Sequence, residues 1–135
     1  DFNKLQPIKQ SATDFIIENL KKYPNEVIII SVGPVTNMAD VIDKDPNALK
    51  MAKKIYAMFG SFYIGYATHP TIDAEWNVKV DIPASKKFVN SGADIVYAGL
   101  DVTAMVKLDK AKRDILLMRQ SVLTNALSGL YILWN

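Results

Sequence analysis

An acid, a large aromatic residue and an amide stand side by side in the stretch DAEWNVKVD, which runs from Asp73 to Asp81. A carboxylate accepts hydrogen bonds from hydroxyl groups, and an amide both accepts and donates them. If the stretch is extended, its side chains alternate, so Glu75 and Asn77 share one face and Trp76 lies on the other. The pattern fits a surface that holds a polyol. It also fits a solvated strand face with Trp76 packed into the core, which the local sequence alone favours.

Other candidate residues directly follow apolar runs. In an open α/β sheet, ligands bind beyond the carboxyl ends of the strands. Val32 precedes Gly33 and Pro34, and because proline has no N–H, the Val32 carbonyl can stay free for a hard cation or a ligand hydroxyl. The same residues also suit an ordinary strand end followed by a helix. Met58 ends a second run, where a core position is the simpler explanation and contact with a ligand the alternative.

Two further residues carry weaker signals. His69, the single histidine, precedes Pro70 in the aromatic, non-periodic segment SFYIGYATHPTI and is interpreted as a loop residue rather than a base. Asp101 follows a third apolar run, where it suits a catalytic acid or the cap of a turn. The sequence contains no nucleophile elbow, phosphate-binding glycine loop or dinucleotide fingerprint, so no complete catalytic machinery is predicted within it.

The elements that must position these residues alternate between helices and strands. Three buried strands are predicted in EVIIISV, KIYAMFG and DIVYAGLDVT, and the first is typical of a strand covered on both faces. EWNVKV, residues 75–80, is predicted as a short strand or extended piece. Helices are predicted at about residues 11–22, 35–41, 46–54, 83–90, 109–119 and 122–134, with Ser11 and Asp81 as the N-caps of the first and the fourth. This order predicts an α/β fold with a mostly parallel sheet.

Composition excludes several classes of protein. The chain has 135 residues, half of them apolar, and a net charge of +2 from 16 basic and 14 acidic residues without a long basic run. Nucleic acid is therefore not an expected partner. The absence of cysteine excludes disulfides and thiol chemistry, and a single histidine excludes a multi-histidine metal site. No segment is apolar enough to predict a membrane span.

The two ends do not have the pattern of natural domain ends. The last predicted helix is apolar up to YILWN, and only three core strands are convincing, whereas open sheets commonly have about five. We therefore expect residues 1–135 to form the central part of a single, larger α/β domain.

Five blocks of the sequence together carry a resemblance to a known family. In order and spacing they resemble the inosine-uridine preferring nucleoside hydrolases, from about Ser11 to Thr103 and more weakly beyond. The blocks are ATDFIIENL, IIISVGPVTNMADVIDKDP, KIYAMFGSF, AEWNVKVDIPASKKFVNSG and IVYAGLDVT. The resemblance implies an open, mixed, mostly parallel sheet with helices on both faces, and hydrolysis of a ribonucleoside to ribose and free base.

The resemblance also implies a calcium ion and roles for individual residues. A hard cation suits a reaction in which an oxocarbenium-like sugar forms and a water becomes nucleophilic. By position, Val32 offers its backbone carbonyl to calcium and Met58 lies against the ribose. Glu75 takes the 5′-hydroxyl and Asn77 reaches the ring hydroxyls. Trp76, which stands where the family usually has phenylalanine, is also expected to bind substrate.

The chain also departs from the family pattern. The acidic N-terminal motif that supplies most calcium ligands and the catalytic base is absent from it, as is the later segment with a histidine and an aspartate. No catalytic residue is therefore assigned here, and this chain alone is expected to be inactive. His69 stands where the family has an asparagine, six residues before Glu75, and Phe59 replaces a glycine. Both changes bear on the 5′-hydroxyl pocket.

Two functions remain as hypotheses. The first is the central part of a calcium-dependent nucleoside hydrolase, and the alternative is a noncatalytic or diverged sugar- or nucleoside-binding protein of the same fold. Both predict a small nucleoside or sugar as partner, without nucleic acid or membrane. Homo-oligomer formation, a cytoplasmic or periplasmic location and the specificity for base and sugar are left open.

Overall fold

The computed structural model describes residues 6–134 and divides into two compact units, the first ending at Met105 and the second beginning at Val106. The first unit contains a sheet of three parallel strands in the order β1-β2-β3. The strands are β1 (Ile28–Ser31), β2 (Lys54–Met58) and β3 (Ile95–Ala98). Each lies within one of the three predicted apolar runs, so the predicted α/β fold with an open parallel sheet is confirmed.

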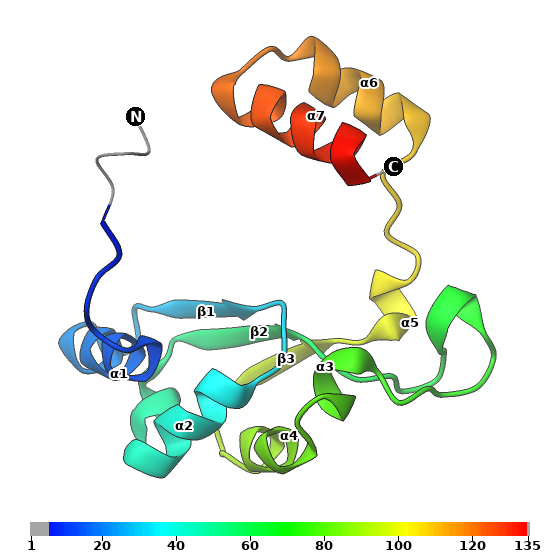
Figure 1. Ribbon diagram of the computed structural model, residues 1–135. Coiled ribbons are helices and arrows are strands. Elements are labelled where there is room, and N and C mark those ends of the chain that lie inside the picture. Colours follow the sequence, from blue (N-terminus) through cyan, green and yellow to red (C-terminus); the bar gives the residue numbers. More distant parts are fainter. Residues whose placement is uncertain (1–5, 135) are drawn as a thin grey trace. The chain divides into compact units, whose positions relative to one another are not determined.

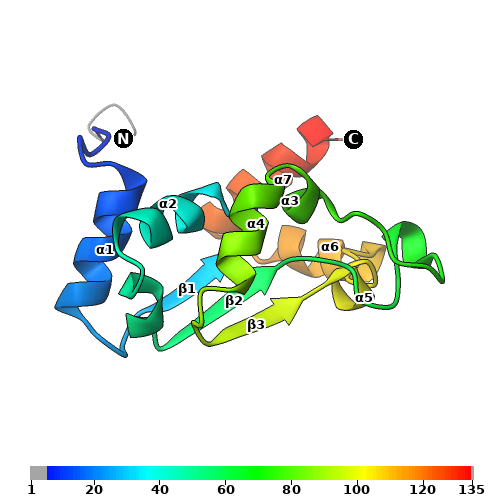
Figure 2. The ribbon, with the colours of Figure 1, turned by 90° about the horizontal axis from the view of Figure 1, so that it is seen from below.

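The longer helices of the first unit lie on one face of this sheet (Figures 1 and 2). They are α1 (Ala12–Lys22), α2 (Thr36–Lys44) and α4 (Ile82–Val89). The short helices are η2 (Ala48–Met51), η3 (Tyr66–Thr68), α3 (Trp76–Lys79) and α5 (Leu100–Thr103). Helices were expected on both faces of the sheet. Within residues 6–105, the longer helices cover one face.

Local sequence explains where two of the longer helices, α1 and α4, start. The Ser11 hydroxyl accepts a hydrogen bond from the Asp14 N–H, which caps α1. The Asp81 carboxylate accepts one from the Ala84 N–H and caps α4, whose first turn also contains a proline. Both caps were predicted, because each stands directly before an apolar helical pattern.

The hydrophobic core lies between these helices and the covered face of the sheet. Ile55 and Ala57 of β2 are fully buried there, together with Leu20 of α1 and Phe88 of α4. Ile30, on the opposite face, is exposed. The prediction that the run EVIIISV is covered on both faces is wrong for the described residues, since every second side chain of β1 remains accessible.

The prediction of an extended EWNVKV is also wrong. Trp76–Lys79 form helix α3, and Glu75 is its N-cap residue, with its side chain accepting hydrogen bonds from Asn77 N and Val78 N. A side chain that satisfies the free N–H groups of a first turn stabilises the helical start, and this outweighs the alternating pattern of the next residues.

The second unit consists of α6 (Lys110–Met118) and α7 (Val122–Trp134), close to the two helices predicted. Asp109 caps α6 by accepting a hydrogen bond from the Lys112 N–H. The guanidinium of Arg113 lies 5.4 Å from the centre of the Tyr131 ring, a contact that joins the two helices. Among the helices described, neither these nor any other is long and apolar enough to cross a membrane.

Candidate functional site

The candidate site lies where the parallel strands end. Ser31, Ala57 and Tyr97 are register partners across the three strands, so Val32 and Met58 each stand one position further along, at the same edge. Helices α3 and α5 lie at this edge of the sheet (Figure 1). The position agrees with the general location of ligand sites in open α/β sheets.

Glu75 is held at this edge by backbone groups. Its carboxylate accepts hydrogen bonds from the N–H of Asn77 at 2.8 Å, of Gly60 at 3.0 Å and of Val78 at 3.3 Å. The residue is only 3% exposed. Because Gly60 follows β2 while the other two donors begin α3, one carboxylate joins the end of a strand to the start of a helix.

Asn77 adds a second link to the same strand. Its Nδ2 donates to the Met58 carbonyl at 3.0 Å and to the Met58 sulfur at 3.2 Å, and the residue is 7% exposed. The structure therefore brings Met58, Glu75 and Asn77 together, and we call these three residues the edge cluster. Trp76, between the two polar residues, is 64% exposed, and its backbone N–H donates to the Tyr66 hydroxyl.

The grouping predicted from alternation is confirmed, although the local structure behind it is different. Glu75 and Asn77 point to the same side and Trp76 away from it because Glu75 is a helix cap, with Asn77 in the first turn. The expectation that Trp76 packs into the core is wrong, since its ring lies on the surface.

The edge cluster keeps some capacity to bind a ligand. A carboxylate has about four acceptor positions, and Glu75 uses three of them on the backbone. Asn77 donates through Nδ2, and no residue within 6–134 donates to its Oδ1. About one acceptor position on Glu75 and two on Asn77 Oδ1 therefore have no partner among the described residues.

Val32 lies beyond the end of β1 and is largely exposed. No hydrogen bond within residues 6–134 ends on its carbonyl oxygen, so this atom is available as a ligand for a hard cation. The described residues contain no group of three histidine or acidic side chains that could hold a metal ion. Their donor set therefore does not form a calcium site by itself.

His69 does not join the edge cluster. Its ring Nδ1 lies 2.8 Å from the Thr71 hydroxyl, and its carbonyl accepts a hydrogen bond from the Gly65 N–H. The residue is exposed, and its described hydrogen bonds stay within the segment between Gly65 and Thr71. The structure thus agrees with the interpretation of His69 as a loop residue.

Gly60 was not identified at the site from the sequence, whereas Asp101 was considered as a catalytic acid or the cap of a turn. Gly60 adopts a φ of 85°, which favours glycine, and this conformation directs its N–H to Glu75. Asp101 accepts hydrogen bonds from three consecutive N–H groups, of Phe62, Tyr63 and Ile64. These bonds, from Phe62 first, hold the pKa of the Asp101 carboxyl below its usual value. For Gly60 the available signal was a glycine just beyond a strand, and for Asp101 the three hydrogen bonds agree with the alternative of a turn cap.

Comparison with known sequences places the chain in a family. Residues 2–132 match the description "Inosine-uridine preferring nucleoside hydrolase". The chain belongs to this family. It is 36% identical over 100 residues to uridine nucleosidase 1 of Arabidopsis thaliana, a match that covers 74% of this chain and 29% of that protein. A pyrimidine-specific ribonucleoside hydrolase of Salmonella newport is 32% identical over 104 residues, covering 77% of this chain and 32% of its own.

Solved nucleoside hydrolase structures share the fold. The purine-preferring ribonucleoside hydrolase from Gardnerella vaginalis superposes with a TM-score of 0.80 at 28% identity, over 90% of this chain and 38% of that one. The chain spans about a third of the length of each of these relatives. The names of the relatives differ in the base that they specify, so family membership leaves the preferred base undecided.

Proposed function

We propose that this chain forms the sugar-holding part of an enzyme that hydrolyses the N-glycosidic bond of a ribonucleoside, yielding ribose and the free base. The observation that carries the proposal is the edge cluster, in which Met58, Glu75 and Asn77 meet at the strand ends of a nucleoside hydrolase family chain. Hydrolysis by the relatives supports the reaction class.

The residues of the edge cluster suit three parts of a ribose. The remaining acceptor position of the Glu75 carboxylate would take the hydrogen of the 5′-hydroxyl, and Asn77 Oδ1 would take that of a ring hydroxyl. The Met58 thioether would lie against the apolar face of the sugar. Because the backbone already holds both polar side chains, little ordering would remain to be done on binding, which favours affinity.

The reaction itself exchanges one bond at the anomeric carbon. The C1′–N bond breaks with its electron pair going to the base, the oxygen of a water bonds to C1′, and the departing base takes up a proton. The edge cluster would bind and orient the sugar, and the activation of water is assigned to none of the described residues. A calcium ion, when bound, would make a water nucleophilic and bind ribose hydroxyls. Val32 would provide one carbonyl ligand to it.

A protein that binds a nucleoside without cleaving it is the second candidate. It is favoured by the fact that the side chains described at the site are suited to holding the sugar, while none is assigned to the attacking water. The two candidates predict the same contacts at Glu75 and Asn77 and differ only in whether free sugar appears.

Release of reducing sugar separates the two candidates. The full-length protein is incubated with inosine, uridine and other nucleosides, with added calcium or with a chelator, and reducing sugar is assayed. The hydrolase predicts release that the chelator suppresses. Binding of a nucleoside by calorimetry with no release would support the binding protein, and neither binding nor release would exclude both.

The edge cluster is tested by Glu75→Gln, which keeps the shape and removes the charge. We expect kcat/KM to fall by about tenfold or more, mainly through KM, because a charged hydrogen bond to the substrate is lost. Asp81→Asn is the matched control, since Asp81 also caps a helix through an N–H but lies outside the edge cluster. It should leave kcat/KM within about twofold. Equal losses in both variants would contradict the role of Glu75.

A further inference from the structure

The segment 61–73 leaves the end of β2 and returns to the edge cluster. A hydrogen bond from the Gly60 N–H to the Glu75 carboxylate joins the residues that flank this segment. The segment therefore forms a closed loop at this edge. Within the loop, the Ser61 hydroxyl donates to the Ile64 carbonyl and accepts from the Asp73 N–H. Asp73 in turn accepts from the Tyr66 N–H at 2.7 Å. We call residues 61–73 the edge loop.

One carboxylate outside the edge loop fastens its first turn. Asp101 Oδ1 accepts from the N–H of Tyr63 at 2.7 Å and of Ile64 at 3.1 Å, and Oδ2 accepts from the Phe62 N–H at 2.9 Å. Asp101 lies in α5, directly after β3, and the Leu100 N–H donates to the Gly60 carbonyl. The edge loop is therefore tied to the end of a strand other than the one from which it leaves.

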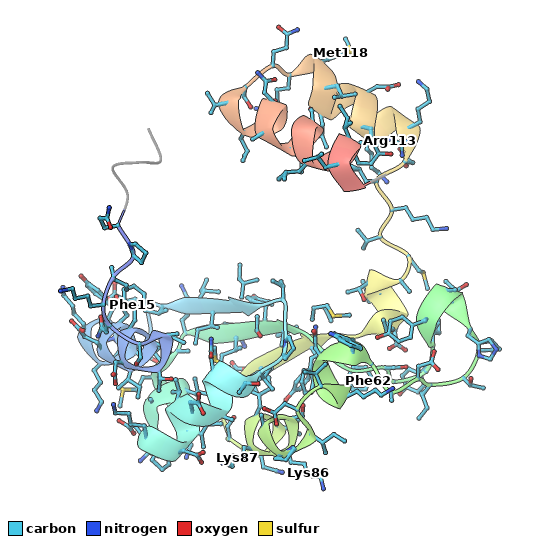
Figure 3. All side chains as sticks on the ribbon, viewed as in Figure 1. Phe15, Phe62, Lys86, Lys87, Arg113 and Met118 are labelled. Carbon is cyan, nitrogen blue, oxygen red and sulfur yellow. The ribbon has the colours of Figure 1, made fainter. Side chains whose placement is uncertain are left out.

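Packing supports the same contact. The Phe62 ring lies 6.3 Å from the Tyr97 ring of β3, at the end of the sheet where α3 and α5 lie (Figure 3). Gly99 makes this approach possible, because a Cβ there would stand 2.8 Å from the Phe62 ring and 2.9 Å from Asp101 Oδ2. A side chain at residue 99 would therefore force the Phe62 ring and the Asp101 carboxylate to move.

We propose that Asp101 is a positioning residue for substrate, which holds the first turn of the edge loop beside the edge cluster so that the site has a wall on the β3 side. The inference rests on the proposed function for its substrate, a ribonucleoside. The proposed role of Asp101 is indirect, because its carboxylate binds three backbone N–H groups of the loop and acts on the substrate only through the position of that loop.

The geometry predicts which kinetic parameter changes. A wall that is already in place contributes to binding in the ground state and in the transition state alike, so its loss raises KM with little change in kcat. A merely structural carboxylate would instead lower the amount of folded protein and leave the KM of the remaining molecules unaltered. The ratio of the two effects therefore distinguishes positioning from general stability.

The test combines amide hydrogen exchange with kinetics on the full-length protein. In Asp101→Ala, the amides of Phe62, Tyr63 and Ile64 should exchange about tenfold faster or more, because each loses a charged acceptor. KM for the best nucleoside should rise by about tenfold with kcat changed by less than about twofold. Asp101→Asn keeps one carbonyl oxygen as acceptor and should show an intermediate change in both measurements.

The matched control is Asp45→Asn. Asp45 also accepts a backbone N–H, from Asn47, and pairs with Lys21, but it lies in neither the edge loop nor the edge cluster. It should leave both measurements unchanged. If Asp101→Ala does not fold, Gly99→Ala provides the second variant. Its Cβ would press on both the Phe62 ring and Asp101 Oδ2 and so disturb the same contact without removing the carboxylate, and the same shift in KM is expected.

The outcomes separate this inference from the proposed function. Faster exchange of the three amides with unaltered KM would overturn the positioning role and leave Asp101 a structural residue. Unchanged exchange would overturn the contact itself. If the wild-type protein neither binds nor cleaves nucleosides, the proposed function fails and with it the substrate assigned to the edge loop, while exchange still decides whether Asp101 holds that loop.

Discussion

The two faces of the β1-β2-β3 sheet are both apolar, yet they have opposite environments. Ile55 points to the face that carries α1, α2 and α4 and is 0% exposed, whereas Ile30 points to the other face and is 73% exposed. Tyr97 and Tyr56 show the same contrast between aromatic residues, since only Tyr97 packs against buried rings. Similar side chains in neighbouring strands therefore differ in the contacts that the tertiary structure gives them.

This contrast shows that an apolar pattern indicates that a strand can be buried. It does not indicate which of the strand's two faces packs against helices. A continuous run of β-branched residues is typical of parallel strands covered on both sides. Within residues 6–105 one face packs against helices, while the other leaves Ile28, Ile30 and Val96 accessible. Substitutions on the two faces should accordingly have unequal effects, and the sizes of these effects test the contrast.

The largest effect is expected on the covered face. Ile55→Ala should lower the free energy of unfolding by about 2–5 kcal/mol, because it removes a fully buried side chain and leaves a cavity between the sheet and the helices. Urea unfolding followed by circular dichroism measures the change. A loss below about 1 kcal/mol would mean that this face is not packed as described.

A smaller effect should appear at high pH through Tyr97. Burial raises the pKa of this phenol above 10.0, so the unfolded chain loses its proton at a lower pH than the folded protein does. The contribution is fully present below about pH 10 and is lost as the pH rises towards the folded pKa. Urea unfolding at pH 8 and above pH 10 should show a decrease that is smaller in Tyr97→Phe, and equal decreases would contradict the burial of the phenol.

The smallest effect is expected on the exposed face. Ile30→Ala repeats the substitution made at Ile55, but it should change the free energy of unfolding by less than about 1 kcal/mol, because little buried area is lost and only strand propensity remains. The same urea titration measures it. A loss as large as that of Ile55→Ala would show that this face is covered in solution.

Much of the fold could be predicted from short-range patterns. The three strands lie inside the predicted apolar runs, and α1 and α4 begin at the predicted caps, because these signals act within a few residues. The run DIVYAGLDVT shows the limit of such patterns. Its first half forms β3, but its second half turns into α5 after Gly99, where the tie to the edge loop requires a residue without a side chain.

The candidate site was predictable in part. Glu75 and Asn77 were identified as candidates, and the structure brings them together with Met58. Their conformation was predicted wrongly, since the Gly60 N–H that completes the Glu75 cap comes from a residue 15 positions earlier. The three hydrogen bonds of Asp101 span 37 to 39 positions, a separation at which neither periodicity nor turn propensity carries information.

Membership of the nucleoside hydrolase family, the apolar runs and the helix caps follow from the amino-acid sequence alone, because each depends on residue order or on contacts within one turn. Which face of the sheet is filled, the helical state of Trp76–Lys79 and the closing of the edge loop by Asp101 were decided by tertiary structure. The physical reason is the same in all three cases. A buried side chain or backbone N–H takes whichever partner the folded chain brings within reach, and that partner can lie anywhere in the sequence.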